Sequence, residues 1–387
     1  MRNHKHIAIF SAYYPPHLGG VELYTRNLAK ELVRAGNEVS VITSSFGKNL
    51  SCAKCTLDDE VNIYSIPSKS VMGDRFPLIL PGPNFASIFQ TIKDLRIDHI
   101  VINTRYYPLN LLGCRIAKIK KITPLIIDHS SGPLSTERNI LGLALRSYER
   151  GMNAVLRRQQ PATCSVSEKG LQWLNGLNFM TYGVVHNAID IKAYRNLASV
   201  RDWRSELSCK EDTMLIVFAG RLIPEKGVLK AIEAVNRIAS SGCSVRLAIA
   251  GDGDLNDKVQ SMQNQNVRFV GRLAQPDLSA LLRDADCFCL PTDYPEGLPT
   301  ILLEAGAWGN SIVTSNCAGA REVIPNGQHG TVLKRNDIES LEKALRVFYS
   351  DESFRTSAGK HVERHIEQHF SWQASANDLM RVLDSLP

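Results

Sequence analysis

The stretch LIVFAGRLIPEKGVLKAIEA, residues 215–234, leads from an apolar run into a helical pattern through a short loop that carries two cations. The apolar run ends at Gly220, and Arg221 and Lys226 follow in the loop. A short, wholly apolar run followed by a helix is typical of a strand in a parallel sheet with both faces covered. The stretch therefore predicts an α/β fold with positive charge at the end of a buried strand.

The same alternation of apolar runs and helical patterns extends along the chain. Residues 20–36, for example, carry apolar side chains at helical spacing. Strands separated by helices indicate a parallel, doubly wound sheet. The predicted strands are residues 6–10, 38–43, 61–66, 99–103, 124–128, 162–166 and 182–186 in the first half, and 214–220, 245–251, 267–271, 286–292 and 311–315 in the second. A more polar segment at about 190–210 separates the two series, which predicts two domains.

Composition and charge restrict the possible partners. The 387 residues are 44% hydrophobic and 22% charged, as in a globular protein. Residues 1–190 hold 22 Lys+Arg against 14 Asp+Glu, whereas residues 191–387 hold 23 against 25. A basic first half suits an anionic partner such as a phospholipid surface or a phosphorylated acceptor, and it equally suits a solvated positive face. No nucleic-acid motif is present, so we expect no nucleic-acid partner.

The location of the protein is predicted from its apolar runs and its cysteines. No apolar run approaches the roughly 18 residues of a membrane-spanning helix. The N-terminal sequence breaks at Pro15-Pro16 and is not that of a signal peptide. The nine cysteines are scattered, which favours reduced thiols. We therefore expect a cytoplasmic protein.

A second predicted strand end carries groups that suit a phosphate. In CLPTDYPEGLPTILLEAGAWG, residues 289–309, a strand is predicted to end near Thr292 and a helix to begin near Pro299. Between them, Gly297 allows the backbone to approach a ligand closely. The backbone amides that could point at a phosphate are those of Gly297, Leu298 and Thr300.

Two acids flank this turn, Glu296 before the helix and Glu304 inside it. A guanidinium, an ammonium and a helix N-terminus together bind anions, whereas carboxylates accept hydrogen bonds from sugar hydroxyls. Arg221 and Lys226 would then serve phosphates, and the two acids a sugar ring and a ribose. The pattern predicts a nucleotide diphosphate sugar as the ligand. Taken alone, the two cations could instead be solvated or pair with Glu225.

At this point the sequence resembles the retaining glycosyltransferases of the GT-B fold, family 4, over nearly its whole length. The motifs that carry the resemblance are GGVELYTRNLAKEL, HNAID, FAGRLIPEKG, GDGDL, FVGRL and EGLPTILLEA. The resemblance implies two facing Rossmann-like domains with a cleft between them. We expect an acceptor-side domain over residues 1–190, a nucleotide-sugar domain over residues 191–370, and a C-terminal helix over residues 371–387 that packs back toward the first domain.

The resemblance also implies roles for matching residues. Arg221 and Lys226 would hold the diphosphate of the donor. Glu296 would hydrogen-bond the donor sugar, and Glu304 would hold the ribose. The loop at Gly19 and Gly20 would close over the phosphates from the first domain.

Two further predicted strand ends supply candidates on the acceptor side. In LIIDHSSG, residues 125–132, His129 lies where similar enzymes contact the transferred sugar, although a histidine bonded to backbone is the simpler reading of the loop alone. In NTRYYPLN, residues 103–110, Arg105 and Tyr106 would line the acceptor side.

Some features depart from the family pattern or imitate other sites. Ala188 stands where the family often has glycine, and EGLP replaces the frequent EGFG, so that Pro299 removes one amide donor. The D-x-D sequences at 252–254 and 284–286 imitate the metal signature of a different glycosyltransferase fold. Because cationic side chains already supply positive charge, we interpret both as structural and expect neither a metal nor another cofactor.

These observations predict a retaining glycosyltransferase. It would move a hexose or N-acetylhexosamine from a nucleotide diphosphate sugar, with UDP favoured, to a lipid-linked or surface-polysaccharide acceptor, as in bacterial polysaccharide or lipopolysaccharide assembly. One alternative is a soluble transferase that acts on a sugar phosphate or a glucan. Another is a non-catalytic partner subunit that binds a sugar nucleotide.

Peripheral contact with an anionic membrane at its inner face is a further expectation. Residues 76–81 with Phe85 and Phe89 form an apolar segment, and Lys118, Lys120 and Lys121 lie further along the basic first half. A proline-rich loop packed on its own domain is the alternative.

Overall fold

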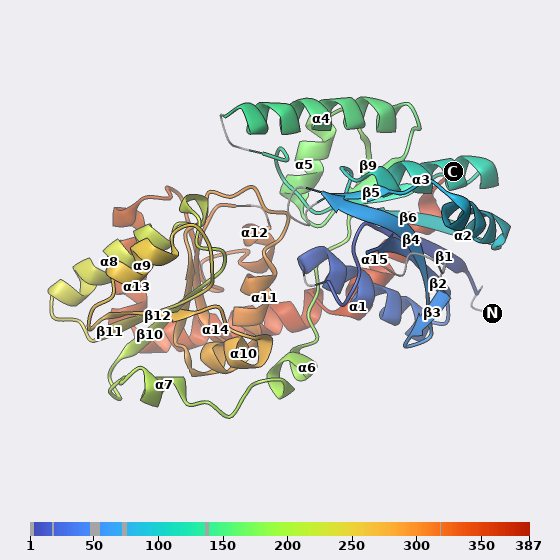
Figure 1. The fold of residues 1–387 in the computed structure, drawn as a ribbon. Coiled ribbons are helices and arrows are strands. Elements are labelled where there is room, and N and C mark those ends of the chain that lie inside the picture. Colours follow the sequence, from blue (N-terminus) through green and yellow to red (C-terminus); the bar gives the residue numbers. More distant parts are fainter. Residues whose placement is uncertain (1–3, 18, 47–54, 72–75, 136–138, 318) are drawn as a thin grey trace. The chain divides into compact units, whose positions relative to one another are not determined.

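The computed structural model describes the chain except residues 1–3, 18, 47–54, 72–75, 136–138 and 318. The chain divides into two compact units (Figure 1). Unit 1 comprises residues 1–187 with 372–387, and unit 2 comprises residues 188–371. Each unit contains its own largely parallel sheet with helices between successive strands, which confirms the predicted α/β class with two Rossmann-like domains.

The sheet of unit 1 has the strand order β3-β4-β2-β1-β6-β7-β8-β9, with β5 paired to β4. Its strands are β1 His6–Ser11, β2 Glu38–Ser45, β3 Cys55–Asp58, β4 Val61–Val71, β5 Phe76–Ile79, β6 His99–Asn103, β7 Leu125–Asp128, β8 Ala162–Ser165 and β9 Met180–Val184. β3 and β5 run antiparallel to β4, and the other pairs are parallel. The order reverses between β1 and β6, which is where doubly wound sheets bind their ligands.

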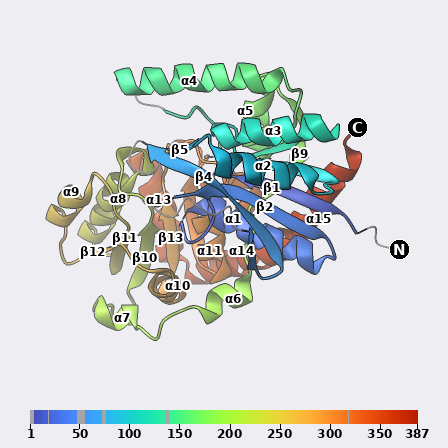
Figure 2. The same cartoon turned by 45° about the vertical axis from the view of Figure 1, so that its right-hand side comes forward.

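Helices cover both faces of this sheet (Figure 2). α1 (Gly20–Arg34) and α15 (Trp372–Ser385) cover one face, and α2 (Pro83–Asp94) and α3 (Pro108–Lys120) cover the other. Because β1 has helices over both faces, all of its residues are buried. α15 reaches α1 through Trp372, whose ring centroid lies 5.8 Å from that of Tyr24. The other helices of unit 1 are α4 Ile140–Arg157 and α5 Glu168–Gly176.

The sheet of unit 2 is parallel throughout, with the order β12-β11-β10-β13-β14-β15. Its strands are β10 Met214–Ala219, β11 Val245–Ala250, β12 Val267–Gly271, β13 Cys287–Leu290, β14 Ser311–Ser315 and β15 Thr331–Leu333. Its helices are α6 Ile191–Asn196, α7 Trp203–Glu206, the 3-10 turn η1 Pro224–Lys226, α8 Val228–Ser240, α9 Asn256–Ser261, α10 Gln275–Asp284, α11 Thr300–Ala307, α12 Ala320–Val323, α13 Ile338–Ser350 and α14 Glu352–His369. Here the order reverses between β10 and β13.

The structure differs from the sequence-based expectation at several elements. β3, β5 and β15 were not predicted, because they are short strands at or beyond a sheet edge. The segment 76–81, for which a proline-rich loop was the alternative to membrane contact, begins with β5, and the polar segment at 190–210 contains α6 and α7. Pro299 is the residue before α11 and not its first residue.

The loop after β10 approaches the loop after β13 closely. The carbonyl oxygen of Glu225 accepts hydrogen bonds from the amide of Asp293 at 2.6 Å and from the hydroxyl of Thr292 at 3.1 Å. Gly227 has a φ of 78°, and a Cβ at this position would collide with the carbonyl oxygen of Pro291. Only glycine satisfies both the left-handed backbone and the close approach.

Replacing Gly227 with alanine should therefore destabilise unit 2. The left-handed backbone costs about 1 kcal/mol for alanine, and the collision with Pro291 adds about 1–3 kcal/mol. Gly242→Ala is the matched control, since Gly242 has a φ of 89° but open space around the position of a Cβ. Urea unfolding measures both variants. Equal losses of stability in the two variants would show that the approach to Pro291 imposes no constraint.

Candidate active site

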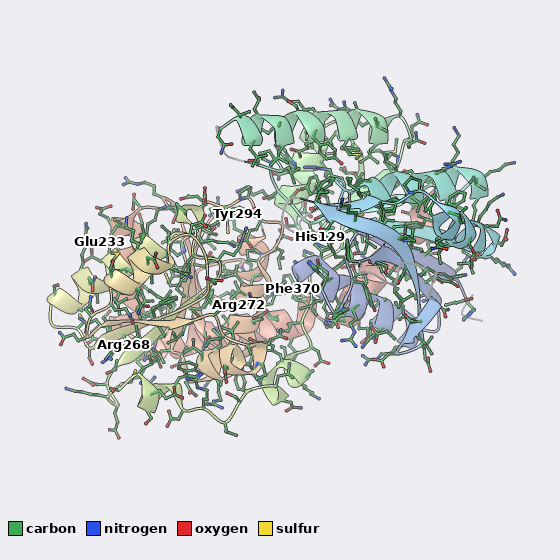
Figure 3. All side chains as sticks on the ribbon, viewed as in Figure 1. His129, Glu233, Arg268, Arg272, Tyr294 and Phe370 are labelled. Atoms are coloured by element: carbon green, nitrogen blue, oxygen red, sulfur yellow. The ribbon has the colours of Figure 1, made fainter. Side chains whose placement is uncertain are left out.

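Two cations and one aromatic ring meet at the ends of β10 and β13. The guanidinium carbon of Arg221 lies 4.8 Å from the ring centroid of Tyr294, and Lys226 Nζ lies 5.4 Å from it. Tyr294 lies at the edge of unit 2 (Figure 3). The Arg221 side chain is exposed, whereas Lys226 is 8% exposed. Both expected cations therefore lie over the ring of Tyr294, a contact that the sequence did not reveal.

Lys226 forms an ion pair with Glu296, which follows β13. The two side chains are 11% and 18% exposed. Burial and the nearby guanidinium of Arg221 lower the pKa of Lys226 to about 8. A pKa of about 8 leaves the ammonium largely charged at neutral pH, where it pairs with the Glu296 carboxylate. The structure thus brings together Arg221, Lys226 and Glu296, as the motif predicts.

The turn before α11 buries one of its side chains and exposes another. Leu298 is 4% exposed, whereas Thr300, the first residue of α11, is exposed. The carbonyl oxygen of Gly297 accepts a hydrogen bond from the amide of Gly319 at 3.0 Å, which fixes the turn. The turn therefore lies at the N-terminus of α11, where backbone N–H groups favour an anion.

Glu304 lies inside α11 and contacts α6. Tyr194 donates a hydrogen bond from its hydroxyl to Glu304 Oε2 at 3.2 Å. Burial raises the pKa of Glu304 to about 7, and the Tyr194 hydrogen bond opposes this rise. The carboxyl group is thus close to half protonated at neutral pH and can donate as well as accept a hydrogen bond. Tyr194 precedes every motif of unit 2, and no sequence signal pointed to it.

The D-x-D sequences have structural partners. Asp284 accepts a hydrogen bond from the amide of Trp203 at 2.8 Å, and Asp286 pairs with Arg204 at 2.9 Å. In the GDGDL turn, the carbonyl oxygen of Asp252 accepts a hydrogen bond from the amide of Leu222 at 2.9 Å. This turn therefore supports the loop that carries Arg221.

In unit 1, His129 lies directly after β7 (Figure 3) and belongs to a polar chain. Its Nε2 donates to Asn103 Oδ1 at 3.4 Å, and Asn103 Nδ2 donates to Thr25 Oγ1 at 2.7 Å. The ring packs edge-on against Tyr24, with centroids 4.7 Å apart. Burial lowers the pKa of His129 to about 3, so the ring is neutral at pH 7. The ends of β6 and β7 thus meet α1 at this histidine.

Gly19 and Gly20 begin α1. Gly19 is the residue before the helix, and a Cβ there would collide with the carboxylate of Glu22. Glu22 is 7% exposed and accepts a hydrogen bond from His17 at 3.0 Å. Gly20 has open space at the position of a Cβ. A larger residue at Gly19 would displace the Glu22 carboxylate, which is the end of a flexible side chain, whereas Gly20 has no such contact.

Arg105 and Tyr106 lie differently from the expectation that they line the acceptor side. Arg105 is 1% exposed and pairs with Asp128 at 3.1 Å and Glu149 at 2.7 Å. The Tyr106 hydroxyl donates to Ser130 Oγ at 2.5 Å. Burial raises the pKa of Asp128, and the Arg105 guanidinium opposes the rise. Both side chains are used inside unit 1, so they support the loop after His129 instead of presenting a surface.

Aromatic rings near the strand ends of unit 1 form a cluster that the sequence did not indicate. Tyr13 stacks on His17 with centroids 4.2 Å apart, and it meets Tyr107 edge-on at 5.9 Å. Phe76 lies 5.6 Å from Tyr107 and 5.3 Å from Tyr148. We call these five residues the aromatic cluster. Because Phe76, Tyr107 and Tyr148 lie far along the chain from Tyr13 and His17, only the fold brings the five together.

Two family models match the chain. Residues 18–193 match Glycosyltransferase Family 4, and residues 199–365 match Glycosyl transferases group 1. The chain is also 24% identical to a GDP-mannose-dependent monoacylated alpha-(1-6)-phosphatidylinositol monomannoside mannosyltransferase of Corynebacterium glutamicum, over 97% of this chain and 96% of that protein.

Solved structures share the fold. Sucrose-phosphate synthase of Thermosynechococcus elongatus superimposes with a TM-score of 0.75 at 18% identity, with 98% of each chain covered. Anabaena HepE in complex with UDP and glucose superimposes with a TM-score of 0.71 at 18% identity, over 99% of this chain and 100% of that chain.

The protonation of Glu304 predicts a pH dependence of stability. The pKa of Glu304 is about 7 in the folded state and 4.5 as its ordinary value. Between these two pH values the carboxyl group keeps its proton in the folded state and loses it in the unfolded state. The free energy of unfolding should then fall as pH rises from about 4.5 to about 7, by up to about 1.4 kcal/mol per pH unit from this group.

Glu304→Gln should flatten this slope, and Glu233→Gln, on the exposed side of α8, should preserve it. Urea unfolding of unit 2 at several pH values provides the measurement. A wild-type slope in Glu304→Gln would contradict the assignment.

Proposed function

The chain belongs to the family 4 and group 1 glycosyltransferases with the GT-B fold, enzymes that use sugar nucleotides, and we propose that it is a retaining hexosyltransferase or N-acetylhexosaminyltransferase. The proposed donor is a UDP-sugar, and the proposed acceptor is a lipid-linked or surface polysaccharide. One observation carries the proposal: Lys226, in the loop after β10 that also carries Arg221, pairs with Glu296 after β13, at the point where the strand order of unit 2 reverses.

Arg221 and Lys226 are proposed to bind the diphosphate. Breaking the bond from the anomeric carbon to oxygen leaves negative charge on the departing diphosphate, and cations fixed nearby lower that barrier. Both side chains are held beside Tyr294, so little reorganisation is needed when charge develops. On this basis the reaction requires no metal ion.

Glu296 is proposed to orient the donor sugar. In the structure its carboxylate neutralises Lys226. A bound diphosphate would take over Lys226, which frees the carboxylate to accept hydrogen bonds from sugar hydroxyls. Retention would then follow from attack by the acceptor hydroxyl on the same face, with the leaving phosphate as base. Glu296 would stabilise positive charge on the sugar without attacking it.

Glu304 is proposed to bind the ribose, and its contact with Tyr194 sets its orientation. The base of the donor stays a proposal. HepE binds UDP, whereas the Corynebacterium relative depends on GDP-mannose. We favour UDP, and donor screening separates the two.

On the acceptor side, the aromatic cluster suits a carbohydrate. Aromatic faces pack against the apolar face of a sugar ring, and Tyr107 and Tyr148 also carry hydroxyl groups. We therefore assign acceptor contact to this cluster instead of to Arg105 and Tyr106. His129, at the end of the neighbouring strand β7, would contact the transferred sugar.

A soluble glucan transferase remains the second candidate, because residues of this chain are 34% identical to Mycobacterium tuberculosis glycogen synthase over 173 residues. That match covers 43% of this chain and 41% of that protein. Product analysis with a water-soluble glucan separates the two candidates. A non-catalytic subunit would transfer no sugar in either assay.

A donor screen tests the proposal directly. UDP-sugars should raise the melting temperature and GDP-sugars should not, and EDTA should leave the shift unchanged because cationic side chains hold the diphosphate. Differential scanning fluorimetry measures this. Stabilisation by GDP-sugars alone would overturn the UDP assignment, and loss of the shift with EDTA would overturn the metal-free one.

Arg221→Ala should lower kcat/KM for donor hydrolysis or transfer on the order of a hundredfold, equivalent to about 3 kcal/mol of transition-state stabilisation. Arg268→Ala is the control, because it removes an exposed arginine from β12 of the same unit (Figure 3). Equal activity of the two variants would remove Arg221 from the site.

Glu296→Gln should reduce transfer strongly and leave the anomeric configuration of the product unchanged, because the amide keeps the shape but loses the charge. Proton NMR of the product reads the configuration at the anomeric carbon. An inverted product from the wild-type protein, or full transfer by Glu296→Gln, would contradict the proposed role.

A further inference from the structure

Helix α4 has a buried side and an exposed side of different character. Met152 and Leu156 pack into the core of unit 1, and Glu149 pairs with Arg105. The positions that face away are Ile140, Ala144, Ser147, Gly151 and Val155, which recur at helical spacing and are all exposed. In both views no element of unit 1 lies outside this helix (Figures 1 and 2).

The exposed side is apolar at its N-terminal end. Ile140 is 88% exposed, Leu141 52% and Leu143 57%. Val155, near the other end, is 40% exposed. Single exposed apolar side chains are ordinary, but three within four residues at one helix end form a patch that water solvates poorly. We call Ile140, Leu141 and Leu143 the α4 tip.

The exposed charged side chains of α4 are positive. Arg150, Arg157 and the following Arg158 are exposed. The acidic residue of the helix, Glu149, is 5% exposed and is neutralised by Arg105. An apolar tip with arginines and no exposed carboxylate, on residues 140–157, which are described throughout, is complementary to a negatively charged lipid surface.

Part of the segment first expected to contact a membrane is engaged within unit 1, whereas Lys118 and Lys121 are exposed. Phe76–Ile79 forms β5, and Phe85 and Phe89 pack against the core. Lys120 donates hydrogen bonds to the carbonyl oxygens of Lys93 and Leu95. None of the helices in the described ranges is long and apolar enough to cross a bilayer.

We propose that the exposed side of α4 docks unit 1 on an anionic lipid bilayer. The α4 tip enters the boundary between headgroups and acyl chains, and Arg150 and Arg158 lie against lipid phosphates.

The buried side of α4 connects this surface to the candidate site. Glu149 Oε2 accepts a hydrogen bond from the amide of Leu134 at 2.9 Å, and the Tyr148 hydroxyl donates to the carbonyl oxygen of Tyr106 at 2.6 Å. Tyr148 also belongs to the aromatic cluster. Docking would therefore hold the proposed acceptor side near the bilayer. The purpose of docking rests on the proposed lipid-linked acceptor, but docking itself depends only on the surface of α4.

Vesicle co-sedimentation of the full chain tests the proposal without any sugar nucleotide. The probes are vesicles of phosphatidylcholine alone and of phosphatidylcholine with phosphatidylglycerol. The chain should bind the anionic vesicles at least tenfold more tightly than the neutral ones, and binding should weaken as salt rises. Equal binding to both vesicles, or binding to neither, would overturn the proposal.

Two double variants assign the surface. Ile140→Ser with Leu143→Ser, and Arg150→Ala with Arg158→Ala, should each lower binding at least tenfold, with wild-type melting temperatures as evidence of folding. Leu57→Ser is the control, because Leu57 is 69% exposed on β3 of the same unit. Unchanged vesicle binding in both double variants would overturn the assignment to α4.

Two further measurements distinguish lipid docking from self-association and from the proposed transferase function. If the α4 tip variant converted a dimer into a monomer in light scattering and left vesicle binding intact, the surface would be an interface between two copies and the proposal would be wrong. Transfer to a water-soluble acceptor reports on the proposed function alone, so vesicle binding without transfer supports docking and contradicts only the function.

Discussion

The ion pair of Lys226 with Glu296 is the interaction on which the candidate donor site depends. The two residues follow β10 and β13, so they meet because parallel strands end at one edge of a sheet and because the strand order reverses between these two. Removing an ammonium and a carboxylate from water costs several kcal/mol per ion unless each finds a partner. Each residue therefore keeps the other charged inside the protein. A phosphate can replace the carboxylate beside Lys226, and sugar hydroxyls would then satisfy the freed carboxylate.

Unit 1 uses buried charge differently. Arg105, Asp128 and Glu149 are at most 5% exposed, and the guanidinium serves both acids. Burial raises the pKa of Asp128, and the Arg105 guanidinium that it shares with Glu149 opposes the rise. Nothing in this group faces solvent, so its effect is to fix the position of the loop after His129. The Lys226–Glu296 pair is partly exposed, so a ligand can replace one partner. The buried group of Arg105, Asp128 and Glu149 offers no such access.

The sequence predicted the central strands and the donor-side residues for a clear physical reason. Strands covered on both faces are uninterrupted apolar runs, and the residues proposed to bind the diphosphate follow such a run. β5 and β15 lack this signal because they lie at or beyond the edge of a sheet. Arg105 resembled a ligand-binding cation because its partner Glu149 lies on a distant helix. The roles of Tyr194 and Tyr294 come from contacts between elements, which no local pattern records.

The crossing of the chain between units at residues 187–188 and again at 371–372 has a consequence for biosynthesis. Unit 2 is inserted, in topological terms, within unit 1. A ribosome therefore completes unit 2 before it makes α15, whose Trp372 lies beside Tyr24 and whose Ser375 donates a hydrogen bond to the carbonyl oxygen of His186 at 2.8 Å. The nascent first unit therefore keeps the α15-facing side of α1 uncovered until the inserted unit has been synthesised and α15 has emerged. Most of unit 1 is made first, yet unit 2 is the first of the two to be complete.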